Sequence, residues 1–467
     1  MTIDLFDCVS PLDFRYYGAD EKLRAELAPY VSEWSRLTAE MQVEVALARV
    51  LERRGVAPPG TADEIEAASG QVTGEEYLEE DRRINHETRA LVNCLQRKVS
   101  PDARRFVHFT VTSFDIKDTA KAWRLKRVAQ EVLLPDLKGF IGVLIEIALR
   151  EKGTLQMGRT HGQHAVPITF GFALAGFVSR LGGRAEALDA AAQNLRGKIS
   201  GAVGAYNASR LFFADPQDFE REVLAELGLE PSPSSTQIVE PEFVVDYLHA
   251  LTSTLGVLAD LADDMRHLQR TEISEVGEVF DPNQVGSSTM PHKRNPWNFE
   301  NVKSFWKAFM PRMVTAYADQ LSEHQRDLTN SATERFLMEL VVAFVCVVRR
   351  LRRVMGRLVT DQARMRANFA WSADMVVAEP AYILLAAAGH PDAHEAIRRL
   401  TLASEQTGEP LVELVPQDEE LRPYWERLTE EQRAVLSDPE RYVGIAAEKT
   451  ERLCREWQER LGLGQRA

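Results

Sequence analysis

The chain has 467 residues, enough for about three structural units at roughly 150 residues each. With 45% apolar and 27% charged residues, its composition is ordinary for a globular protein and excludes wholesale disorder. Because 56 Lys and Arg face 70 Asp and Glu, the net charge is −14 and a nucleic-acid-binding surface is not expected. This balance still allows a local cationic pocket for a small anion.

No segment has the length of a membrane span. The most apolar window, residues 336–348, is short and contains Glu339, so a buried helix is expected there. The first residues carry neither a basic stretch nor a hydrophobic run, and no secretory signal is expected. Four widely spaced cysteines without a CxxC pair indicate a reducing compartment rather than a disulfide frame or a zinc site. We therefore expect a cytoplasmic protein that does not contact membranes.

Long helical periodicity is the dominant pattern. From Val244 to Leu268 apolar residues recur every three or four positions, which predicts one helix of at least 25 residues. Helices this long are typical of a bundle, because neighbouring helices or subunits must cover their apolar stripes. Comparable stretches cover residues 115–152 (with Pro135 inside), 170–194, 300–322 and 333–358.

The distribution of helix breakers predicts three mainly helical domains. Residues 1–111 form shorter helices, interrupted at residues 58–60 and at Gly70. Residues 112–364 form the central bundle of long helices. Prolines return in residues 365–467, where Thr429 and Gln432 have the spacing of a capping box. Strand signals are short and irregular, so the predicted fold class is all-α rather than a parallel α/β sheet.

Several catalytic motifs are absent from the sequence. It contains no GxxxxGK[ST], no GxGxxG after a strand, no HExxH and no GxSxG. His390 and His394 have the i, i+4 spacing of metal ligands, but Pro391 follows the first and no third ligand is near. We therefore expect a loop that enters a helix there, and no metal.

Two polar segments between the predicted long helices have the composition of a binding site. Residues 158–167 place His161 between a threonine and a glycine at a turn, where an imidazole can face a cleft. Residues 286–296 combine glycine, three consecutive hydroxyl residues and two prolines, which specify a loop. Lys293 and Asn295 supply donors that suit a carboxylate. The second segment therefore predicts an anion-binding site.

The string GSSTMPHKRNP at residues 286–296 resembles the signature of the fumarase/aspartase superfamily. Within that superfamily, further segments resemble motifs of the adenylosuccinate lyase family, and the resemblance extends from residue 10 to about residue 446. Two positions depart from the family pattern, since Glu87 stands where aspartate is frequent and residues 330–332 replace a longer His-Ser-Ser version. The matching segments are residues 10–16, 108–116, 158–167, 197–207, 236–238, 325–331 and 438–444.

The resemblance implies a mainly helical fumarase/aspartase-like fold and a defined reaction. The family cleaves a C–N bond in N-succinyl purine nucleotides by anti β-elimination and releases fumarate. The proton that leaves lies beside a carboxylate, so the carbanion adds negative charge to an already anionic group. Such a reaction needs a base, a cationic clamp and an acid for the leaving nitrogen. No metal or organic cofactor is required.

By resemblance, five residues take the catalytic roles. Ser287 would abstract the Cβ proton as an alkoxide, and His161 would protonate the departing amine. Lys293 would bind the carboxylate that gains charge. His86 would orient His161 or contact the substrate, and Glu300 is a candidate to orient His161.

Substrate binding is implied for two further groups of residues. The carboxylates of the succinyl group would be bound by Thr112, Ser113, Thr160, Gln237 and Asn295. The nucleotide phosphate would be bound by Arg15, Tyr16, Arg326, Ser331 and Arg335, with His108 close by. Arginine suits the second task because its guanidinium donates a bidentate pair of hydrogen bonds.

The leading hypothesis is therefore an enzyme of this family that acts on adenylosuccinate, giving AMP, and on the succinocarboxamide ribotide of purine biosynthesis, giving AICAR. The first alternative is another superfamily lyase or a cycloisomerase, such as one for 3-carboxy-cis,cis-muconate, acting on a smaller succinate-like substrate. Arg15, Arg326 and Arg335 distinguish the two, because a substrate without phosphate offers them no anion. The second alternative, a catalytically silent structural protein, is disfavoured because Ser287, Lys293 and His161 are all present.

The resemblance also implies an assembly. The family forms a homotetramer whose active sites take residues from different subunits, so we expect Ser287 and His161 to reach one site from two chains. Besides a second copy of itself, the expected partner is a small nucleotide substrate.

Overall fold

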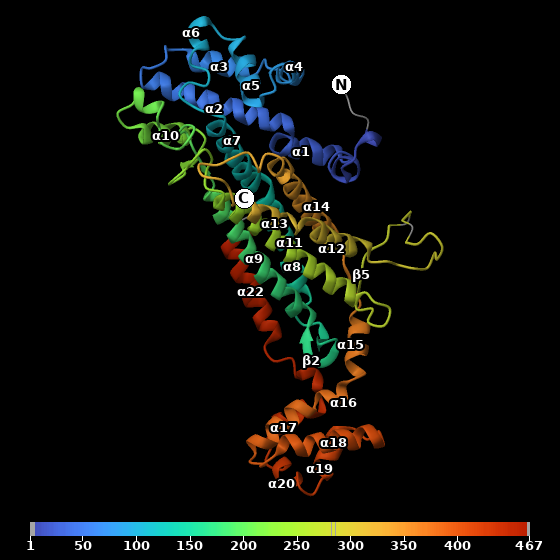
Figure 1. Cartoon of the computed structure of the whole chain (residues 1–467). Helices are drawn as coiled ribbons and strands as arrows, with labels where there is room; N and C mark the ends of the chain where they lie inside the picture. Colours follow the sequence, from blue (N-terminus) through green and yellow to red (C-terminus); the bar gives the residue numbers. More distant parts are fainter. Residues whose placement is uncertain (1–4, 282, 285, 465–467) are drawn as a thin grey trace. The chain divides into compact units, whose positions relative to one another are not determined.

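The computed structural model describes residues 5–281, 283–284 and 286–464. Helices dominate this part of the chain, and its strands form only two-stranded sheets (Figure 1). This architecture confirms the predicted all-α class. No single helix within the described ranges has both the length and the apolar composition of a membrane span, whereas the bent pair 362–370 and 373–387 passes that test when taken together.

The chain folds into two compact units, each built from three separate stretches of sequence. Unit 1 comprises Met1–Leu137, Gly183–Gly256 and Ser304–Arg349, and unit 2 comprises Lys138–Gly182, Val257–Lys303 and Arg350–Ala467. The boundaries near residues 111 and 364 that the sequence indicates stay a prediction. Each unit is described by itself below.

The long helices follow the apolar periodicity. Leu251, Leu255 and Leu258 on α11 are at most 1% exposed, which confirms the stripe predicted from Val244 to Leu268. Burial of each such side chain contributes about 1.5–3 kcal/mol to the stability of the helix in the bundle. The long helices are α7 (Ser113–Val128), α8 (Leu134–Arg150), α9 (Phe170–Gln193), α11 (Glu242–Leu268), α12 (Trp297–Phe309) and α14 (Leu337–Met355).

Two of the predicted long stretches are interrupted. A π-helical turn, η3 (Ala129–Leu133), lies between α7 and α8, directly before Pro135, which cannot donate a helical hydrogen bond. Residues 300–322 do not form one helix, so that prediction is wrong. They contain most of α12 and the separate helix α13 (Arg312–Ala318), which follows Pro311. The ring of Pro311 both removes a donor and clashes with the preceding turn.

The N-terminal part of unit 1 consists of short helices and one long one, α2 (Glu33–Arg53, 21 residues), so the prediction of only shorter helices there is wrong for α2. Ser32 ends α1 (Glu21–Val31), and its Oγ caps α2 by accepting a hydrogen bond from Ser35 N at 3.1 Å. Met41, Val45 and Ile65 lie in the hydrophobic core of this part. Its elements are η1 (Leu5–Asp7), η2 (Leu12–Tyr16), α1 (Glu21–Val31), α2 (Glu33–Arg53), α3 (Thr61–Ser69), α4 (Gly74–Ile84), α5 (Glu87–Gln96) and α6 (Pro101–Arg104).

Within the last hundred residues of unit 2, the short helices of residues 377–436 pack around Leu385, Ile397 and Leu411. The predicted capping box is confirmed, since Thr429 N donates to Gln432 Oε1 at 2.9 Å and Gln432 N donates to Thr429 Oγ1 at 3.2 Å.

Outside this core, Phe369 packs with Leu155 and Met157, and Trp457 lies against Gly182 of α9. The helices of this last part of the chain are α15 (Gln362–Ala370), α16 (Ala373–Val376), α17 (Ala378–Ala387), α18 (Ala393–Thr407), α19 (Leu411–Gln417), α20 (Arg422–Trp425), α21 (Glu430–Ser437), η6 (Pro439–Arg441) and α22 (Ala446–Leu461). Three remaining short helices belong to unit 1: η4 (Ser209–Leu211), α10 (Pro216–Ala225) and η5 (Thr333–Phe336).

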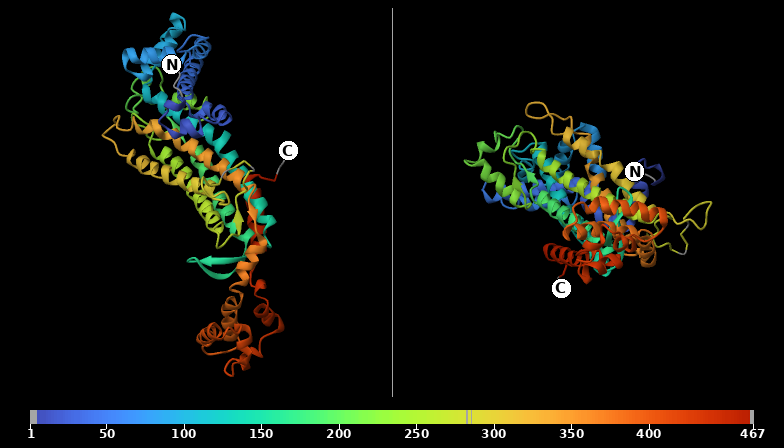
Figure 2. Two further views of the ribbon diagram at one scale, coloured as in Figure 1. Left: turned by 90° about the vertical axis from the view of Figure 1, so that its right-hand side faces the viewer. Right: turned by 90° about the horizontal axis from the view of Figure 1, so that it is seen from below.

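The longest strands form an antiparallel hairpin, β1 (Leu155–Thr160) with β2 (Gln163–Thr169). Its turn residues, His161 and Gly162, have φ of 55° and 75°, the left-handed pair typical of a two-residue type I′ turn. The sequence indicates the turn but not the strands. Figure 2 shows the turn end of this ribbon projecting clear of the helices of its unit. The other strands pair β3 (Arg196–Gly197) with β4 (Glu230–Pro231) and β5 (Val276–Gly277) with β6 (Val359–Thr360).

Candidate active site

The predicted site residues fall into both units. Unit 2 holds the signature loop and the hairpin turn, with Thr160, His161, Ser287, Lys293, Asn295 and Glu300. Unit 1 holds the predicted phosphate-binding residues and most of the predicted carboxylate-binding ones: Arg15, Tyr16, His86, His108, Thr112, Ser113, Gln237, Arg326, Ser331 and Arg335.

The signature loop lies between β5 and α12 and projects from them in Figure 1. Asn295 closes it, because its Nδ2 donates to the Gly286 carbonyl at 2.8 Å. A Cβ on Gly286 would lie 2.2 Å from the Lys293 carbonyl oxygen, so only glycine fits. The prediction of a loop is confirmed. The hydrogen bond between Asn295 and Gly286 joins the two ends of the loop, and the loop itself does not pack into the core.

Ser287 is oriented by backbone groups of its own loop. Its Oγ accepts hydrogen bonds from Met290 N at 3.1 Å and from Thr289 N at 3.4 Å. Donors aimed at a hydroxyl oxygen stabilise the negative charge that develops when its proton leaves. Ser287 is half-buried while Lys293 is exposed. The loop therefore presents a hydroxyl with two N–H groups already behind it.

His161 stands exposed at the tip of the hairpin, next to Thr160, whose backbone pairs with Gln163. The nearby His164 has a different environment, since its Nδ1 bonds Ser372 Oγ at 2.7 Å. Of the two histidines, His161 is the more exposed, and His164 is held by Ser372.

The unit 2 residues are not joined to one another. Within the described part of that unit, no hydrogen bond connects His161 to Ser287 or to Glu300. Glu300 is exposed on the first turn of α12. The role of Glu300 therefore stays a prediction.

His86 is the N-cap of α5, and its Nδ1 accepts from Arg89 N at 3.2 Å, which leaves Nε2 for another partner. The next residue, Glu87, bonds Lys117 Nζ and the Arg335 guanidinium, each at 2.6 Å. Burial alone would raise the pKa of Glu87, but these two cations outweigh it and lower the pKa to about 2. The structure thus brings Arg335, one of the predicted phosphate ligands, beside His86.

Thr112 and Ser113 stand at the N-terminus of α7, where backbone N–H groups and the helix dipole favour an anion. Asp115, in the first turn, accepts from Thr112 N at 2.8 Å and from Ser200 N at 3.1 Å. Its carboxylate also forms an ion pair with Lys198, and both side chains are fully buried. The buried pair therefore fixes the start of α7 to the segment that follows β3.

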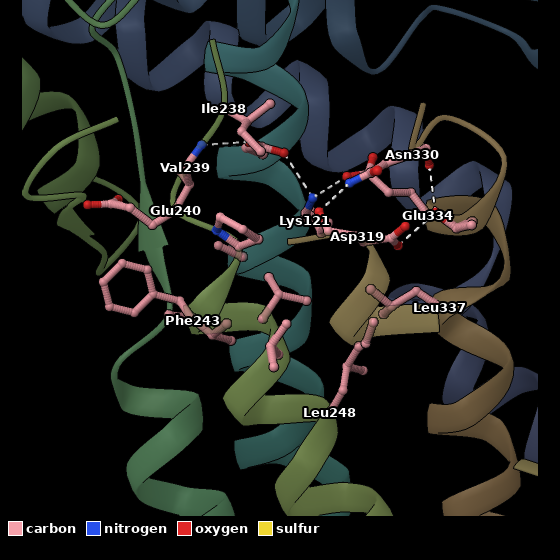
Figure 3. A pocket seen from close by; sticks show the side chains of 18 of the residues that line it. Lys121, Ile238, Val239, Glu240, Phe243, Leu248, Asp319, Asn330, Glu334 and Leu337 are labelled. Carbon is pink, nitrogen blue, oxygen red and sulfur yellow. Dashed lines mark hydrogen bonds and ion pairs between the residues drawn. The ribbon is translucent and has the colours of Figure 1, made fainter. Parts of the chain in front are cut away.

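Two segments with predicted binding residues are tied to α7 further along. Lys121 Nζ contacts Asp118 Oδ1 and Glu334 Oε1, both at 2.9 Å, and Asp118 Oδ2 accepts from Val239 N at 2.9 Å. Figure 3 shows these interactions at the polar end of a pocket whose other walls include Phe243, a largely apolar surface. Ser331 and Arg335 flank Glu334, and Gln237 lies two residues before Val239, so α7 organises both segments.

Arg326 has a left-handed backbone, with φ of 96°, and its guanidinium donates to the Asp319 carbonyl at 2.6 Å. Gln237 N donates to the carbonyl of Gln325 at 3.3 Å, so the Gln237 and Arg326 segments are neighbours. The N-terminal motif lies in the π-helical η2. There the ring of Tyr16 packs edge-on against Phe305, with centroids 4.7 Å apart, and Arg15 is exposed. That Arg15, Arg326 and Arg335 bind one common phosphate stays a prediction.

Sequence reasoning missed the residues that hold the site in place. They are Glu44, whose carboxylate contacts His108, and Lys117, Asp118 and Lys121, together with the Asp115–Lys198 pair. The available signal was burial, since Glu44 lies in an apolar helix face with Met41 and Val45, where an unpaired carboxylate is unfavourable. The apolar pattern around Glu44 could not predict that its partner is His108.

The long helices, the short sheets and the polar loops define a fumarase-type lyase. The family model described as "Lyase" matches residues 14–308, and the one described as "Adenylosuccinate lyase C-terminal" matches residues 322–441. Among solved structures, the 3-carboxy-cis,cis-muconate lactonizing enzyme of Pseudomonas putida aligns with 97% of this chain and 100% of its own, at a TM-score of 0.82 and 26% identity. A fumarate lyase from Mesorhizobium, with a TM-score of 0.80 over 92% of this chain and 97% of its own, is 24% identical and supports the fold alone.

Proteins with similar sequences identify the family within this class of lyases. An adenylosuccinate lyase from Pyrococcus horikoshii is 34% identical over 94% of this chain and 96% of its own length. The adenylosuccinate lyase of Aquifex aeolicus is 32% identical over 89% of this chain and 94% of its own. The chain belongs to the adenylosuccinate lyase family.

Proposed function

We propose that this chain eliminates fumarate from adenylosuccinate, giving AMP, and from the succinocarboxamide ribotide, giving AICAR. The observation that carries the proposal is the signature loop, where Ser287 Oγ already accepts two backbone N–H groups beside Asn295. Family membership over nearly the whole chain supports the same substrate class.

In this proposal, Ser287 removes the Cβ proton of the succinyl group. Its alkoxide is stabilised by the N–H groups of Thr289 and Met290. Lys293 and Asn295 bind the carboxylate on which the carbanion charge accumulates. The C–N bond then breaks, and its electron pair goes to the leaving nitrogen.

His161 supplies a proton to that nitrogen, which completes the elimination. His86 and Glu300 are proposed to orient His161. Thr112, Ser113, Thr160 and Gln237 bind the succinyl carboxylates, and the N-terminus of α7 suits this role because it favours anions. Arg15, Tyr16, Arg326, Ser331 and Arg335 bind the phosphate, with His108 beside them.

The test is an assay of the purified protein on adenylosuccinate, with fumarate and AMP measured as products. Equal amounts of both are expected. The structural likeness to the muconate lactonizing enzyme favours a second candidate, a lyase or cycloisomerase for a smaller substrate. Turnover of 3-carboxy-cis,cis-muconate, with none of adenylosuccinate, would favour that candidate.

The substitution Arg326→Ala is expected to weaken nucleotide binding by about 1.5–3 kcal/mol, the range for a hydrogen bond to a charged group. KM for adenylosuccinate should therefore rise more than KM for the dephosphorylated succinyl nucleoside. Arg24→Ala is a suitable control, because this guanidinium lies outside the predicted site and donates to the Gly18 carbonyl. An equal loss for both substrates would show that Arg326 does not bind the phosphate.

We further propose that the protein is a cytoplasmic homotetramer with shared active sites. Exposed apolar side chains on and after α13, among them Val314 at 67% and Leu321 at 78%, support a partner surface there. The lack of a hydrogen bond between Ser287 and His161 within the described residues of one chain is consistent with sites built from two chains. The wide spacing of the four cysteines, without a CxxC pair, agrees with a reducing compartment.

Sharing of sites predicts complementation between two inactive variants. Ser287→Ala and His161→Gln, unfolded together and refolded, should recover activity, because about a quarter of randomly assembled sites receive both intact residues. Each variant refolded alone is the control, and mass measurement confirms the hybrids. Hybrid tetramers without recovered activity would place the two residues in the same chain's site.

A further inference from the structure

The turn before α7 has two residues in an unfavourable backbone conformation, which contacts with the surrounding fold must stabilise. His108 has φ of 65° and Thr110 has φ of 64°, and neither is a glycine. Side chains with a Cβ rarely adopt the left-handed region, and such residues persist where neighbours fix them, commonly at functional sites. The turn is followed directly by Thr112 and Ser113, so it lies next to predicted substrate ligands.

One carboxylate holds this turn. Glu44, on α2, has a side chain that is 2% exposed, and its Oε2 accepts the backbone N–H of His108 at 2.8 Å. Its Oε1 lies 2.7 Å from Nδ1 of the same histidine. The two contacts fix both the backbone and the ring plane of His108. The buried neighbours of Glu44 on α2 are apolar side chains such as Met41 and Val45 and the carboxylate of Glu40, so the hydrogen bonds to this buried group come from His108.

The contact with Glu44 also determines which ring nitrogen of His108 remains free to bind a ligand. A carboxylate only accepts hydrogen bonds, so Nδ1 carries a proton toward it. The His108 side chain is 19% exposed, and within the described residues Nε2 has no hydrogen-bond partner. Burial opposes a charge on this ring, but Glu44 outweighs it, with Asp115 acting in the same sense and Arg89 against, so the pKa of His108 is raised.

We propose that Glu44 is a positioning residue that holds His108 so that its Nε2–H is presented to the substrate phosphate. This inference rests on the proposed function. The phosphate is preferred over the succinyl carboxylates because it is the more highly charged anion. The contact with Glu44 favours the charged form of the His108 ring, and a charged donor makes a stronger hydrogen bond to an anion than a neutral one.

The informative variant is Glu44→Gln. The glutamine carbonyl can still accept from the His108 backbone, but its amide donates to Nδ1, so the ring keeps its place and loses its charge. Exchange of the histidine Cε1 hydrogen for deuterium, followed by mass spectrometry of the full-length protein, reports the titration of each histidine. The midpoint for His108 should fall by about one pH unit or more in the variant, as expected when a neighbouring opposite charge is removed.

The kinetic readout separates phosphate from carboxylate. A raised pKa means that the wild-type ring loses its charge only as pH rises through that higher value, whereas the variant loses it at a lower pH. Between the two midpoints, KM for adenylosuccinate should rise about tenfold in Glu44→Gln, while KM for the dephosphorylated nucleoside stays unchanged, and below both midpoints the difference should vanish. Glu52→Gln, on the same helix and bonded to Ala62 N instead, is the matched control.

An unchanged exchange midpoint for His108 would overturn the positioning role, and an equal rise in KM for both substrates would overturn the phosphate assignment. If Glu44→Gln does not fold, His108→Gln tests the phosphate assignment and should show the same phosphate-selective loss, while Glu44→Asp, whose shorter side chain draws the carboxylate away from the ring, tests the positioning role by a lower exchange midpoint for His108. Failure of the proposed function is distinct from these results, because wild-type protein would then not turn over adenylosuccinate at all.

Discussion

Replacing Ser287 by alanine should lower kcat for adenylosuccinate by about 10²- to 10⁴-fold, the usual contribution of a general base. The hydroxyl is proposed to take the Cβ proton, and the alanine methyl group cannot accept it. The melting temperature should stay unchanged, because the loop is held by the Asn295–Gly286 hydrogen bond rather than by Ser287. Steady-state kinetics and thermal unfolding of the same preparation measure the two quantities.

Ser288→Ala is the matched control for this experiment. Its hydroxyl is one position further along the same loop, and the variant should retain near wild-type turnover with either substrate. If Ser287→Ala keeps wild-type turnover, Ser287 is not the base. If Ser288→Ala loses as much turnover as Ser287→Ala, the role of base cannot be assigned to Ser287 alone.

Lys198→Met should destabilise the fold by about 3–5 kcal/mol, the cost of leaving one partner of a buried ion pair without the other. Asp115 would then remain fully buried, and the backbone N–H groups of Thr112, Ser200 and Gly201 would still donate to it without a paired cation. Unfolding in urea, followed at several protein concentrations, measures the loss.

Lys126→Met is the control for the lysine substitution itself, because Lys126 donates to the Gly228 carbonyl near the surface of the same unit. Lys126→Met should lower the free energy of unfolding by well under half as much as Lys198→Met. Equal losses for Lys198 and Lys126 would show that the buried pair contributes nothing beyond an ordinary lysine contact. Asp115→Leu combined with Lys198→Met should not restore stability, since the three backbone donors would lose their acceptor.

Periodicity predicted the long helices well because each buries one continuous stripe, as α9 and α11 do. The prediction failed where a proline ring interrupts a helix whose apolar periodicity continues. Pro311 removes a donor in the middle of an otherwise helical pattern and separates α12 from α13. The β1–β2 hairpin was missed because its strands change from buried at Leu155 to exposed at Thr160, so neither a helical nor a strand period is sustained.

For the site, short polar strings identified the groups proposed to meet the substrate but not the groups that hold them. Ser287, Asn295 and Gly286 lie within ten residues of one another, so their loop could be predicted. Glu44 is 64 residues from His108, and Asp115 is 83 residues from Lys198. Partners that distant meet only through the tertiary fold, and neither composition nor spacing specifies them.

The ion pairs around Glu87 bear on how fast a nucleotide anion reaches the site. Arg335 is already paired with Glu87, which also binds Lys117, so an approaching phosphate meets a cluster of net charge +1 and not two free cations. Screening over a Debye length of about 8 Å at physiological ionic strength acts on that net charge. The ionic-strength dependence of kcat/KM should therefore be shallower than a count of the cationic side chains suggests.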